Sequence, residues 1–423
     1  MEGYIVDRTI LHVDCNKFFA SVECLHRPEI RSFPVVVGGS EESRHGIVLT
    51  KNEIASKYGI ETAEPLWKAR QKCSNLIVVP PNYPLYARFS RLVRDILNDY
   101  SSNIEPFGLD EAWVDVTESA AMFGSGEKIA EEIRQRVKFE LGITVSIGVS
   151  YNKIFAKLGS DYKKPDAITV ISRENFKKIV WPLPAYNLLC IGKATYKKLC
   201  SHYRYTIGDV ANTDPELLHR WFGKNGYMLH SFANGYNNDP VMKTGYKSDV
   251  KSISNSITSP RDLVSDEDVK SVFLVLGESV ARRLRDQGLY TKNICISLRN
   301  NMLNTVTCQR ELDCATNITA EICETAYNIY KTSYQKTSPL RSVGICAQSL
   351  IPDTTPIQLD IFKDHKNREK KEKIDQAVDI LKHRYGNGCI TLARVMKNND
   401  ITCFDPYSKH TIHPVGYFNT VRK

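Results

Sequence analysis

Short runs rich in valine and isoleucine alternate with helix-like stretches over residues 10–175. Five of these runs have the length and composition of strands, namely residues 10–13, 33–37, 77–79, 112–116 and 144–149. Between the last two, Ile129, Ile133, Val137 and Leu141 recur every four residues, which predicts a helix with one apolar face. This part of the chain is therefore expected to be an α/β or α+β domain.

A proline-containing segment at residues 182–187 marks the end of that domain. A mostly helical stretch follows, and residues 234–250, which contain NGYNNDP and several lysines, have the composition of a linker. The pattern therefore predicts a small helical part between two larger folded parts.

A second α+β unit is predicted after the linker. Residues 265–288 form a helical pattern that starts with a capping-box-like Ser265 and Asp268 and stops at Gly288. Residues 291–301 alternate between polar positions and the apolar Ile294, Ile296 and Leu298. Such alternation predicts a half-buried strand, so this unit is expected to have one open sheet face.

The end of the chain carries a highly charged stretch at residues 363–373. An amphipathic helix is predicted after it, with Ile374, Ala377, Val378 and Leu381 on one face.

Composition narrows the class of protein. The 423 residues carry a formal net charge of +9, and the 42% hydrophobic and 25% charged fractions are ordinary globular values that argue against a disordered or fibrous chain. No apolar run approaches the ~18 residues of a membrane span, and the first residues do not begin a signal peptide. We expect a monomeric, cytoplasmic protein without membrane contact.

The 12 cysteines are scattered and form no CxxC pair. Free thiols in a reducing compartment are therefore favoured over structural zinc. The positive charge lies after residue 175, whereas the part before it is slightly acidic. This distribution fits a protein that grips a polyanion and does metal chemistry on it, although a charge that serves only solubility is an equal alternative at this point.

Three carboxylates stand at predicted strand ends. Asp14 interrupts the apolar HVDCNKFFASVE (12–23), and Asp110 and Glu111 lie at the head of the strand in FGLDEAWVDV (107–116). Two divalent cations at a phosphoryl site need about three converging carboxylates at a metal separation of roughly 3.5–4 Å. The alternative for any one of them is a solvated turn carboxylate. Asp14, placed directly before a buried helix start, fits that alternative poorly.

The segment TVSIGVSYNKIFAKLGSDYKKP (144–165) predicts a strand, a turn and a basic helix that ends in Lys163 and Lys164. Lysines at this place could meet the phosphates of a nucleotide, although a Lys-Lys-Pro end is also common on a solvated surface.

Together and in this order, the three motifs strongly resemble the Y-family translesion DNA polymerases, and in particular their bacterial DNA polymerase IV branch. The resemblance covers roughly residues 8–350. It implies an α+β multidomain right-hand polymerase. Its parts would be an α/β palm with fingers at 1–175 (fingers about 30–75), a helical thumb at 176–243, an α+β little finger at 244–352 and a clamp-binding tail at 353–423.

The resemblance also implies the metal and nucleotide sites. Asp14, Asp110 and Glu111, with the main-chain carbonyl of Cys15, would hold two Mg²⁺, and Lys164 would meet the triphosphate of a dNTP. Phe19 would be the steric gate against a ribose 2′-OH. Phe18 would line the triphosphate pocket, with core packing as the alternative for both rings.

The fingers depart from the family pattern. Family members usually have a Tyr and an Arg three residues apart on the triphosphate, and here Glu53 and Ser56 take those positions. Thr50 is retained, and one or both of Lys51 and Lys57 are expected to replace the missing arginine; the alternative is that Glu53 only orients one of these lysines. Another departure is Asn16, at a position that is usually acidic.

The expected partner is primer-template DNA. Residues 188–211 resemble a helix-hairpin-helix in which Cys190 replaces the first glycine while Gly192 keeps the second, so Gly192 and Lys193 are expected at a DNA phosphate, with ordinary helical packing as the alternative. On the open face of the little finger, Lys292 and Arg299 are expected to follow the duplex backbone, with Lys251 and Arg310 nearby.

The segment QLDIF (358–362) has the form of a peptide that binds the bacterial sliding clamp. Gln358, Leu359, Ile361 and Phe362 would enter a clamp pocket as a short extended segment, and a packing segment is the alternative.

The sequence therefore predicts a low-fidelity, lesion-bypass DNA polymerase. One alternative is another palm-type nucleotidyltransferase such as a nucleotide cyclase, which would need neither residues 180–350 nor QLDIF. The other is a catalytically silent, clamp-tethered DNA-binding subunit of a mutagenic repair complex. Such a subunit would be expected to have lost one of the three carboxylates, and all are present.

Overall fold

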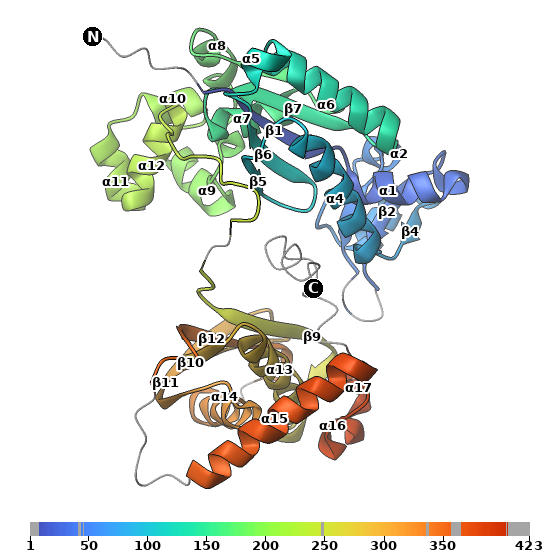
Figure 1. Ribbon diagram of the computed structural model, residues 1–423, viewed down its shortest axis with the longest axis vertical. Coiled ribbons are helices and arrows are strands. Elements are labelled where there is room, and N and C mark those ends of the chain that lie inside the picture. The colour runs from blue at the N-terminus through green and yellow to red at the C-terminus, as the bar shows by residue number, and fades with distance from the viewer. Residues whose placement is uncertain are drawn as a thin grey trace. The chain divides into compact units, whose positions relative to one another are not determined.

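The computed structural model describes residues 8–40, 44, 46–246, 249–335, 338–356, 365–402 and 404. They fall into two compact units, the first made of residues 8–38 and 47–246 and the second mainly of residues 249–404 (Figure 1). Within the described residues, no helix is both long and apolar enough to cross a membrane.

A five-stranded sheet in the order β5-β6-β1-β7-β8 forms the centre of the first unit. Its strands are β1 (Ile10–Cys15), β5 (Ile104–Pro106), β6 (Glu111–Asp115), β7 (Val145–Ser150) and β8 (Ile168–Ile171). β1 pairs antiparallel with both β6 and β7, and all of its residues are buried. Because its edges are paired and its faces covered, a charged side chain on β1 is held inside the molecule rather than on its surface.

One face of this sheet is covered by α1 (Phe18–His26), α4 (Tyr83–Asn98) and α6 (Gly126–Leu141), with the short α5 (Ala120–Phe123) beside α6. Helices α4 and α6 lie side by side over the sheet (Figure 1). Their buried apolar residues join those of β1, β6 and β7 in a single core. Burial of such side chains provides about 1.5–3 kcal/mol each and fixes how the strand ends meet.

Helix α7 (Lys153–Tyr162) crosses β7 at very short range. A Cβ atom on Gly148 would overlap the carbonyl oxygen of Ala156, so only glycine allows this approach. The crossing brings the polar side of α7 close to the residues of β1.

A small three-stranded sheet, in the order β3-β2-β4, also belongs to the first unit. It consists of β2 (Val35–Gly38), β3 (Val48–Lys51) and β4 (Ile77–Val79), with η1 (Pro28–Ile30), α2 (Glu53–Lys57) and α3 (Leu66–Lys72). A helical group follows, made of α8 (Phe176–Val180), η2 (Ala185–Asn187), α9 (Lys193–Ser201), α10 (Ile207–Ala211), α11 (Pro215–Phe222) and α12 (Lys224–Ala233). This group shares a core with α7.

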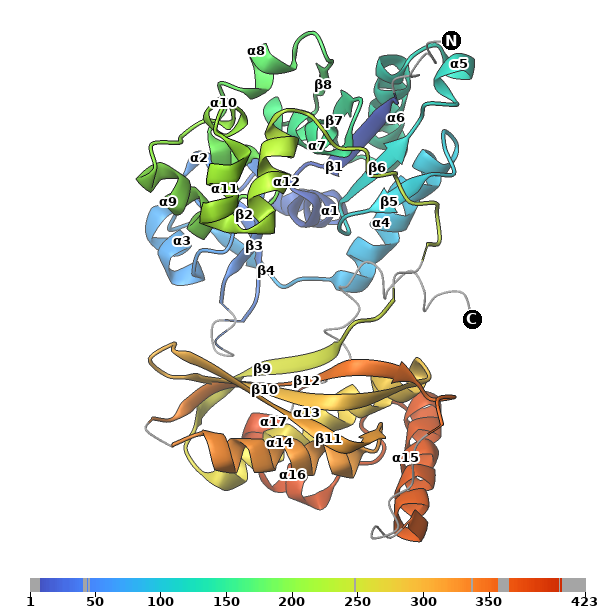
Figure 2. The same cartoon turned by 90° about the vertical axis from the view of Figure 1, so that its left-hand side faces the viewer.

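The second unit is an antiparallel sheet in the order β11-β10-β12-β9, with helices on one face (Figure 2). Its strands are β9 (Ile253–Leu263), β10 (Leu289–Asn300), β11 (Thr305–Thr316) and β12 (Leu340–Pro352), and its core helices are α13 (Asp266–Asp286) and α14 (Thr319–Ser333). The described tail adds α15 (His365–Tyr385), α16 (Ala393–Lys397) and α17 (Asn399–Thr402).

The predicted strands and helices of both units are confirmed to within a few residues. The capping box of Ser265 and Asp268 is present, and Gly288 follows α13 with a left-handed φ of 62°. The sequence pattern did not single out the short strands β3, β5 and β8 or the long strands β9, β11 and β12.

The sheet register corrects the expected position of Arg310. Arg310 pairs with Ile294, a core residue, so both side chains lie on the helix side of the sheet, and Arg310 donates to Thr332 Oγ1 of α14 at 3.3 Å. Arg310 is therefore not a neighbour of Arg299 on the open face.

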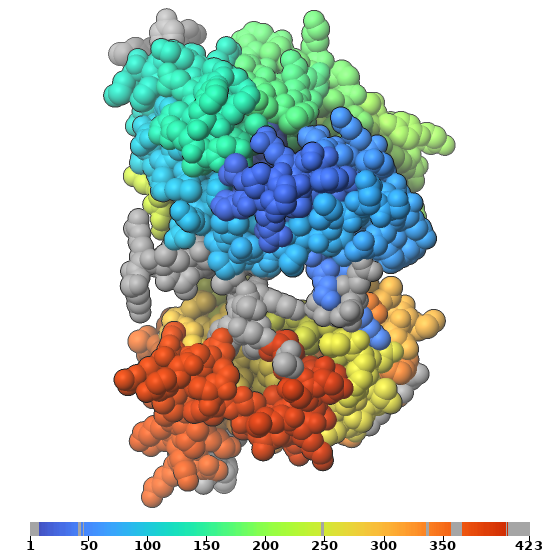
Figure 3. Space-filling model, turned by 90° about the vertical axis from the view of Figure 1, so that its right-hand side faces the viewer, coloured from blue at the N-terminus to red at the C-terminus, as the bar shows by residue number. Residues whose placement is uncertain are grey.

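The predicted tail helix is confirmed, and α15 packs through its charged side. Asp379 and Lys382 are buried, whereas Ile374 is 52% and Leu381 38% exposed. Arg285 of α13 contacts Asp375 and Asp379 at 3.2 and 2.6 Å. The surface that α15 contributes to the second unit (orange-red in Figure 3) therefore includes apolar side chains.

Candidate active site

Asp14 and Glu111 are brought together by the pairing of β1 with β6. They are directly opposite one another in the antiparallel register, so both side chains point to the same face. Asp110 immediately precedes β6, and its carbonyl oxygen accepts a hydrogen bond from the N–H of Cys15 at 2.9 Å. The acidic residues that are 96 or 97 positions apart in the sequence thus lie at adjoining strand ends.

The protonation of these carboxyl groups reflects strong crowding. Burial, together with the charges of Asp14 and Glu111, raises the pKa of Asp110 to about 6. Burial also raises the pKa of Asp14, against the opposing charges of Lys164 and Lys157. For Glu111 burial acts in the same direction, but the contact with His12 and the charge of Lys157 lower its pKa to about 2. Burial is therefore the first cause of the raised pKa values of Asp14 and Asp110, whereas the partners of Glu111 keep it ionised.

Two lysines from the α7 region lie on the same oxygens. Lys157 Nζ forms an ion pair with Glu111 and lies 3.5 Å from Asp14 Oδ2. Lys164 Nζ lies 2.8 Å from Asp14 Oδ2 and 2.7 Å from Asp161 Oδ1. These ammonium groups occupy positions where a bound cation would place its positive charge.

His12 completes the cluster from within β1. Its Nε2 lies 3.3 Å from Glu111 Oε2, its Nδ1 lies 2.8 Å from Ser160 Oγ, and burial lowers its pKa. Ligand atoms of His12, Asp14 and Glu111 lie within 4.8 Å of one another, which is close enough to share a metal ion. With one nitrogen on Ser160 and the other beside Glu111, His12 is better placed to orient Glu111 than to bind a metal itself.

The donor set fits hard divalent cations. Three carboxylates and a main-chain carbonyl are oxygen ligands of the kind that Mg²⁺ prefers. The raised pKa values of Asp14 and Asp110 show that added positive charge would be favourable there.

Phe18 and Phe19 differ in their surroundings. The Phe18 ring is buried in the core of the first unit, so any part in nucleotide binding is left to its main chain. Phe19 is partly exposed, and its ring stacks on Tyr86 with centroids 4.2 Å apart and planes 11° apart. Tyr86 is itself fixed by a 2.7 Å hydrogen bond from its hydroxyl to Glu23. The Phe19 ring is therefore held in one place.

Thr50 and Lys51 lie on β3, and Lys57 lies in the last turn of α2. Lys51 is partly buried, and burial followed by the charge of Lys17 lowers its pKa. Lys57 is exposed, and its expected contact with a triphosphate stays a prediction.

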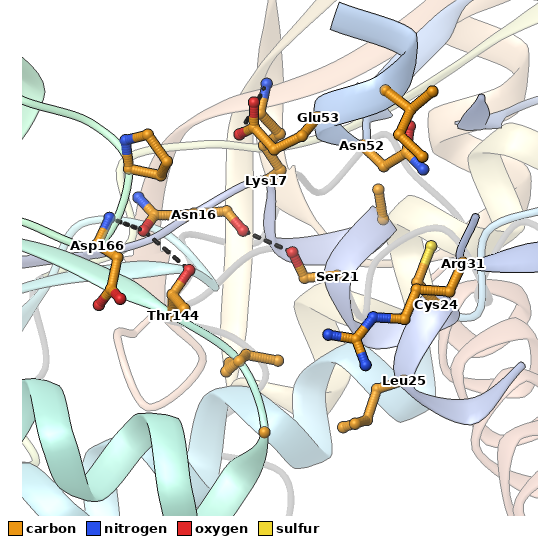
Figure 4. Close-up of a pocket in the computed structure, with 15 residues that line it drawn as sticks. Asn16, Lys17, Ser21, Cys24, Leu25, Arg31, Asn52, Glu53, Thr144 and Asp166 are labelled. Carbon is orange, nitrogen blue, oxygen red and sulfur yellow. Dashed lines mark hydrogen bonds and ion pairs between the residues drawn. The ribbon is translucent and has the colours of Figure 1, made fainter. Parts of the chain in front are cut away.

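A cavity of about 310 Å³ opens beside Asn16 and Lys17 (Figure 4). Asn16 Oδ1 accepts hydrogen bonds from the Asp166 N–H at 2.8 Å and from Thr144 Oγ1 at 3.1 Å, and its amide nitrogen donates to Ser146 Oγ at 2.8 Å. An aspartate would lack the donor. This explains an amide at a position that is usually acidic: Asn16 ties the β1–α1 turn to β7 and to the segment after α7.

The hairpin before α9 has the backbone expected of a tight turn. Cys190 adopts a left-handed φ of 72°, and Gly192 is the N-cap of α9, which begins at Lys193. The side chain of Cys190 therefore stands where a glycine would suit the backbone better.

In the second unit, Lys251, Lys292 and Arg299 are exposed. Arg299 pairs with Thr305 and Ser342 and lies on the open face, and Lys292 lies at a bulge of β10. The residues expected to bind a sliding clamp, Gln358, Leu359, Ile361 and Phe362, lie outside the described residues.

Sequence reasoning missed three residues of the site: His12, Lys17 and Lys157. The signal for Lys157 was its place four residues after Lys153 and seven before Lys164, on the polar side of a basic helix. His12 and Lys17 carried no such signal, because their partners come from distant segments.

Comparisons with known proteins agree over most of the chain. The sequence profile of the impB/mucB/samB family matches residues 13–161, and the profile of that family's C-terminal domain matches residues 250–361. DNA polymerase IV of Acetivibrio thermocellus is 49% identical over 379 residues, which cover 90% of this chain and 95% of that protein. DNA polymerase IV 1 of Bacillus subtilis is 34% identical and covers 93% of this chain and 94% of its own length.

A solved structure, the Y-family DNA polymerase chimera Dbh-Dpo4(243-245)-Dbh, superposes with a TM-score of 0.70 at 24% identity, covering 81% of this chain and 99% of that one. This likeness confirms the expected α+β right-hand polymerase fold. With these relatives matched over nearly their full length, the chain belongs to the DNA polymerase IV family of Y-family DNA polymerases.

Proposed function

We propose that this lesion-bypass DNA polymerase joins a dNTP to a primer 3′-OH at a site where Asp14, Asp110, Glu111 and the main-chain oxygen of Cys15 hold two Mg²⁺. The observation that carries the proposal is the convergence of three carboxylates at the adjoining ends of β1 and β6. Mg²⁺ bound there would lower the pKa of the primer hydroxyl and offset the charge on the phosphates.

Lys164 would change its partner when substrate binds, whereas Lys157 would keep its own. Lys164 is 35% exposed in its side chain and bonds to Asp14, so its ammonium group can turn to a phosphate once Asp14 binds a cation. Lys157 is more enclosed, at 17%, and would stay beside Glu111. Both would keep the site close to neutral through the reaction.

Phe19 would act as the gate against ribonucleotides. Its ring is fixed on Tyr86 and partly exposed, which is what a steric filter requires. A fixed ring excludes a 2′-OH by overlap rather than by an unmade hydrogen bond.

Primer-template DNA would be bound through its phosphates. Gly192 and Lys193 at the start of α9 would offer main-chain N–H groups and a charge, and Lys251, Lys292 and Arg299 would follow the backbone along the second unit. Gln358, Leu359, Ile361 and Phe362 would bind the sliding clamp. The enzyme would work as a monomer in the cytoplasm.

The experiment is primer extension with Mg²⁺ on undamaged and abasic templates. Asp110→Ala and Glu111→Ala are expected to reduce extension by at least about a hundredfold, because each removes a ligand of the charge-stabilising metals. DNA binding should be nearly unchanged. Glu118→Gln, an exposed carboxylate just after β6, is the matched control.

Extension above about one hundredth of the parent rate in both variants would remove Asp110 and Glu111 from the metal site. No extension by the parent chain, with DNA binding intact, would instead favour the silent DNA-binding subunit.

A further inference from the structure

Lys17 lies at the junction of β1 and α1, three residues after Asp14. It is the N-cap of α1 and has a left-handed backbone, with φ 48° and ψ 43°. Its ammonium group contacts Ser56 Oγ at 2.5 Å and Glu53 Oε1 at 3.4 Å, both on α2 (Figure 4 shows Lys17 and Glu53). A non-glycine residue in this conformation is uncommon. Here it directs the long cationic side chain of Lys17 from the end of β1 to α2.

The ammonium group of Lys17 has three protons. Ser56 and Glu53 account for two of them, which leaves one donor for a further acceptor. Glu53 is 56% exposed in its side chain, so water weakens its hold on Lys17. Lys17 is therefore oriented by α2 without being neutralised by it.

Lys51 adds a second positive charge to the same place. It ends β3, two residues before α2, and it is partly buried. Burial first, and then the charge of Lys17, lowers the pKa of Lys51, while Glu61 and Glu64 act in the other direction. Glu64 is itself paired with Lys72 at 2.7 Å. Two cations that destabilise one another would both gain from an anion between them.

The first turn of α1 strengthens this preference. α1 has nine residues and no side chain caps its N-terminus, so its first N–H groups add to the attraction for phosphate oxygens. The carboxylates proposed to hold the metals lie immediately before it, at Asp14 and Asp110. An anion that contacts both Lys17 and the metals proposed at Asp14 and Asp110 must carry several charged groups in a row, as a polyphosphate does.

We propose that Lys17 binds the polyphosphate of the incoming nucleotide, with Ser56 and Glu53 orienting its ammonium group and Lys51 as the second cation. The inference rests on the proposed function and adds to it a contact made from α1. It assigns to Lys17 the charge that the serine at position 56 cannot supply, whereas the sequence pointed to Lys51 and Lys57.

Two measurements test this role. Lys17→Ala is expected to raise the KM for dNTP by about 10-fold or more, with a much smaller change in kcat, because one charge-assisted hydrogen bond to phosphate is lost. The Kd of dNTP for the enzyme on a dideoxy-terminated primer should rise in parallel, with no chemistry involved. If the contacts of Lys17 with Ser56 and Glu53 served only to hold α1 to α2, Lys17→Ala would lower the Tm and leave the KM and the Kd for dNTP unchanged. That result would overturn the inference.

A rescue variant separates charge from structure. In the double variant Lys17→Ala/Ser56→Arg, the arginine replaces the α2 residue that Lys17 contacts, and its guanidinium takes the volume that the lysine side chain leaves. The KM for dNTP should then return to within about threefold of the parent value. Lys68→Ala, an exposed lysine on α3, is the control and should leave KM unchanged. A double variant no better than Lys17→Ala, or a Lys17→Arg variant as impaired as Lys17→Ala, contradicts the proposal.

The proposed function is judged separately, by Mg²⁺-dependent extension with the parent chain. If the parent does not extend the primer, that function fails, whereas the Kd comparison on the terminated primer still decides the role of Lys17.

Discussion

Arg285→Met is expected to release helix α15 from the second unit. The Arg285 guanidinium donates to Asp379 at 2.6 Å, to Asp375 at 3.2 Å and to the carbonyl oxygen of Asn317 at 2.7 Å. Its side chain is only 9% exposed, and those of Asp375 and Asp379 are 18% and 13% exposed. Methionine keeps much of the volume and removes every one of these hydrogen bonds.

The free-energy cost of Arg285→Met follows from the two aspartates, Asp375 and Asp379, that lose their partner. Removing one partner of a buried ion pair leaves uncompensated charge at a cost of about 3–5 kcal/mol. The two aspartates can escape this cost by moving into water together with α15. Ile374 is 52% and Leu381 38% exposed even in the packed state, so the contacts that still resist this movement are mainly the ion pairs of Lys382 with Glu278 and of Arg368 with Glu321. We therefore expect local release of α15 rather than unfolding of the unit.

Hydrogen exchange over residues 365–385 measures this release directly. A loss of about 3 kcal/mol corresponds to a fall in protection of about 150-fold, while β10 and β12 should keep the protection they have in the parent. Arg384→Met, at an exposed position on α15 itself, is the control. Protection of α15 in Arg285→Met equal to that of the parent would show that packing by ion pairs does not hold this helix.

Phe19→Ala should admit ribonucleotides, because the ring that fills the sugar 2′ position is gone; unchanged discrimination between dATP and ATP would remove the gate assignment. Leu359→Ala/Phe362→Ala should abolish stimulation by the clamp and leave basal extension intact. This variant is preferable to truncation before residue 353, since Ile401 is buried in the core of the second unit. Asp268→Asn should lower the free energy of unfolding by about 1–2 kcal/mol at neutral pH, because it removes the negative charge and one of the two acceptor oxygens and thereby the ion pair with Arg261. The hydrogen bond and charge of Arg261 lower the pKa of Asp268 to about 2, so its contribution is complete above the unfolded value near 4 and is lost as pH falls through 2. Urea unfolding at pH 7 and pH 2.5 should therefore show a difference between parent and variant that is clearly smaller at the lower pH.

Local sequence patterns predict many of the helices and strands of the fold. β-branched runs, the apolar period of α6 and the Ser265 capping box each depend on residues that are close in the sequence, and all were predicted with nearly correct bounds. The length of a strand did not decide whether it was recognised, because the three-residue β4 was predicted and the long strands β9, β11 and β12 were not.

The carboxylates proposed to hold the metals were also recognisable, because Asp14, Asp110 and Glu111 stand at the ends of strong strand signals. That they converge depends on the order β6-β1-β7, which no local pattern specifies. The same order brings His12 to Glu111, and the close crossing of α7 over Gly148 brings Lys157 there.

The tertiary structure decided the remaining assignments. Proximity in the sequence pointed to Lys51 and Lys57 as replacements for a missing arginine, and the fold adds Lys17, which lies against Ser56 from a segment 39 residues away. The apolar face of α15 was visible in the sequence, but the side of α15 that is buried is the charged one. It is buried because Arg285 of α13 forms ion pairs with Asp375 and Asp379. Sequence determines what each element can be from the preferences of its own residues. Which side chains meet is determined by packing among distant elements, since a charge or an apolar face is satisfied only by what the fold brings against it.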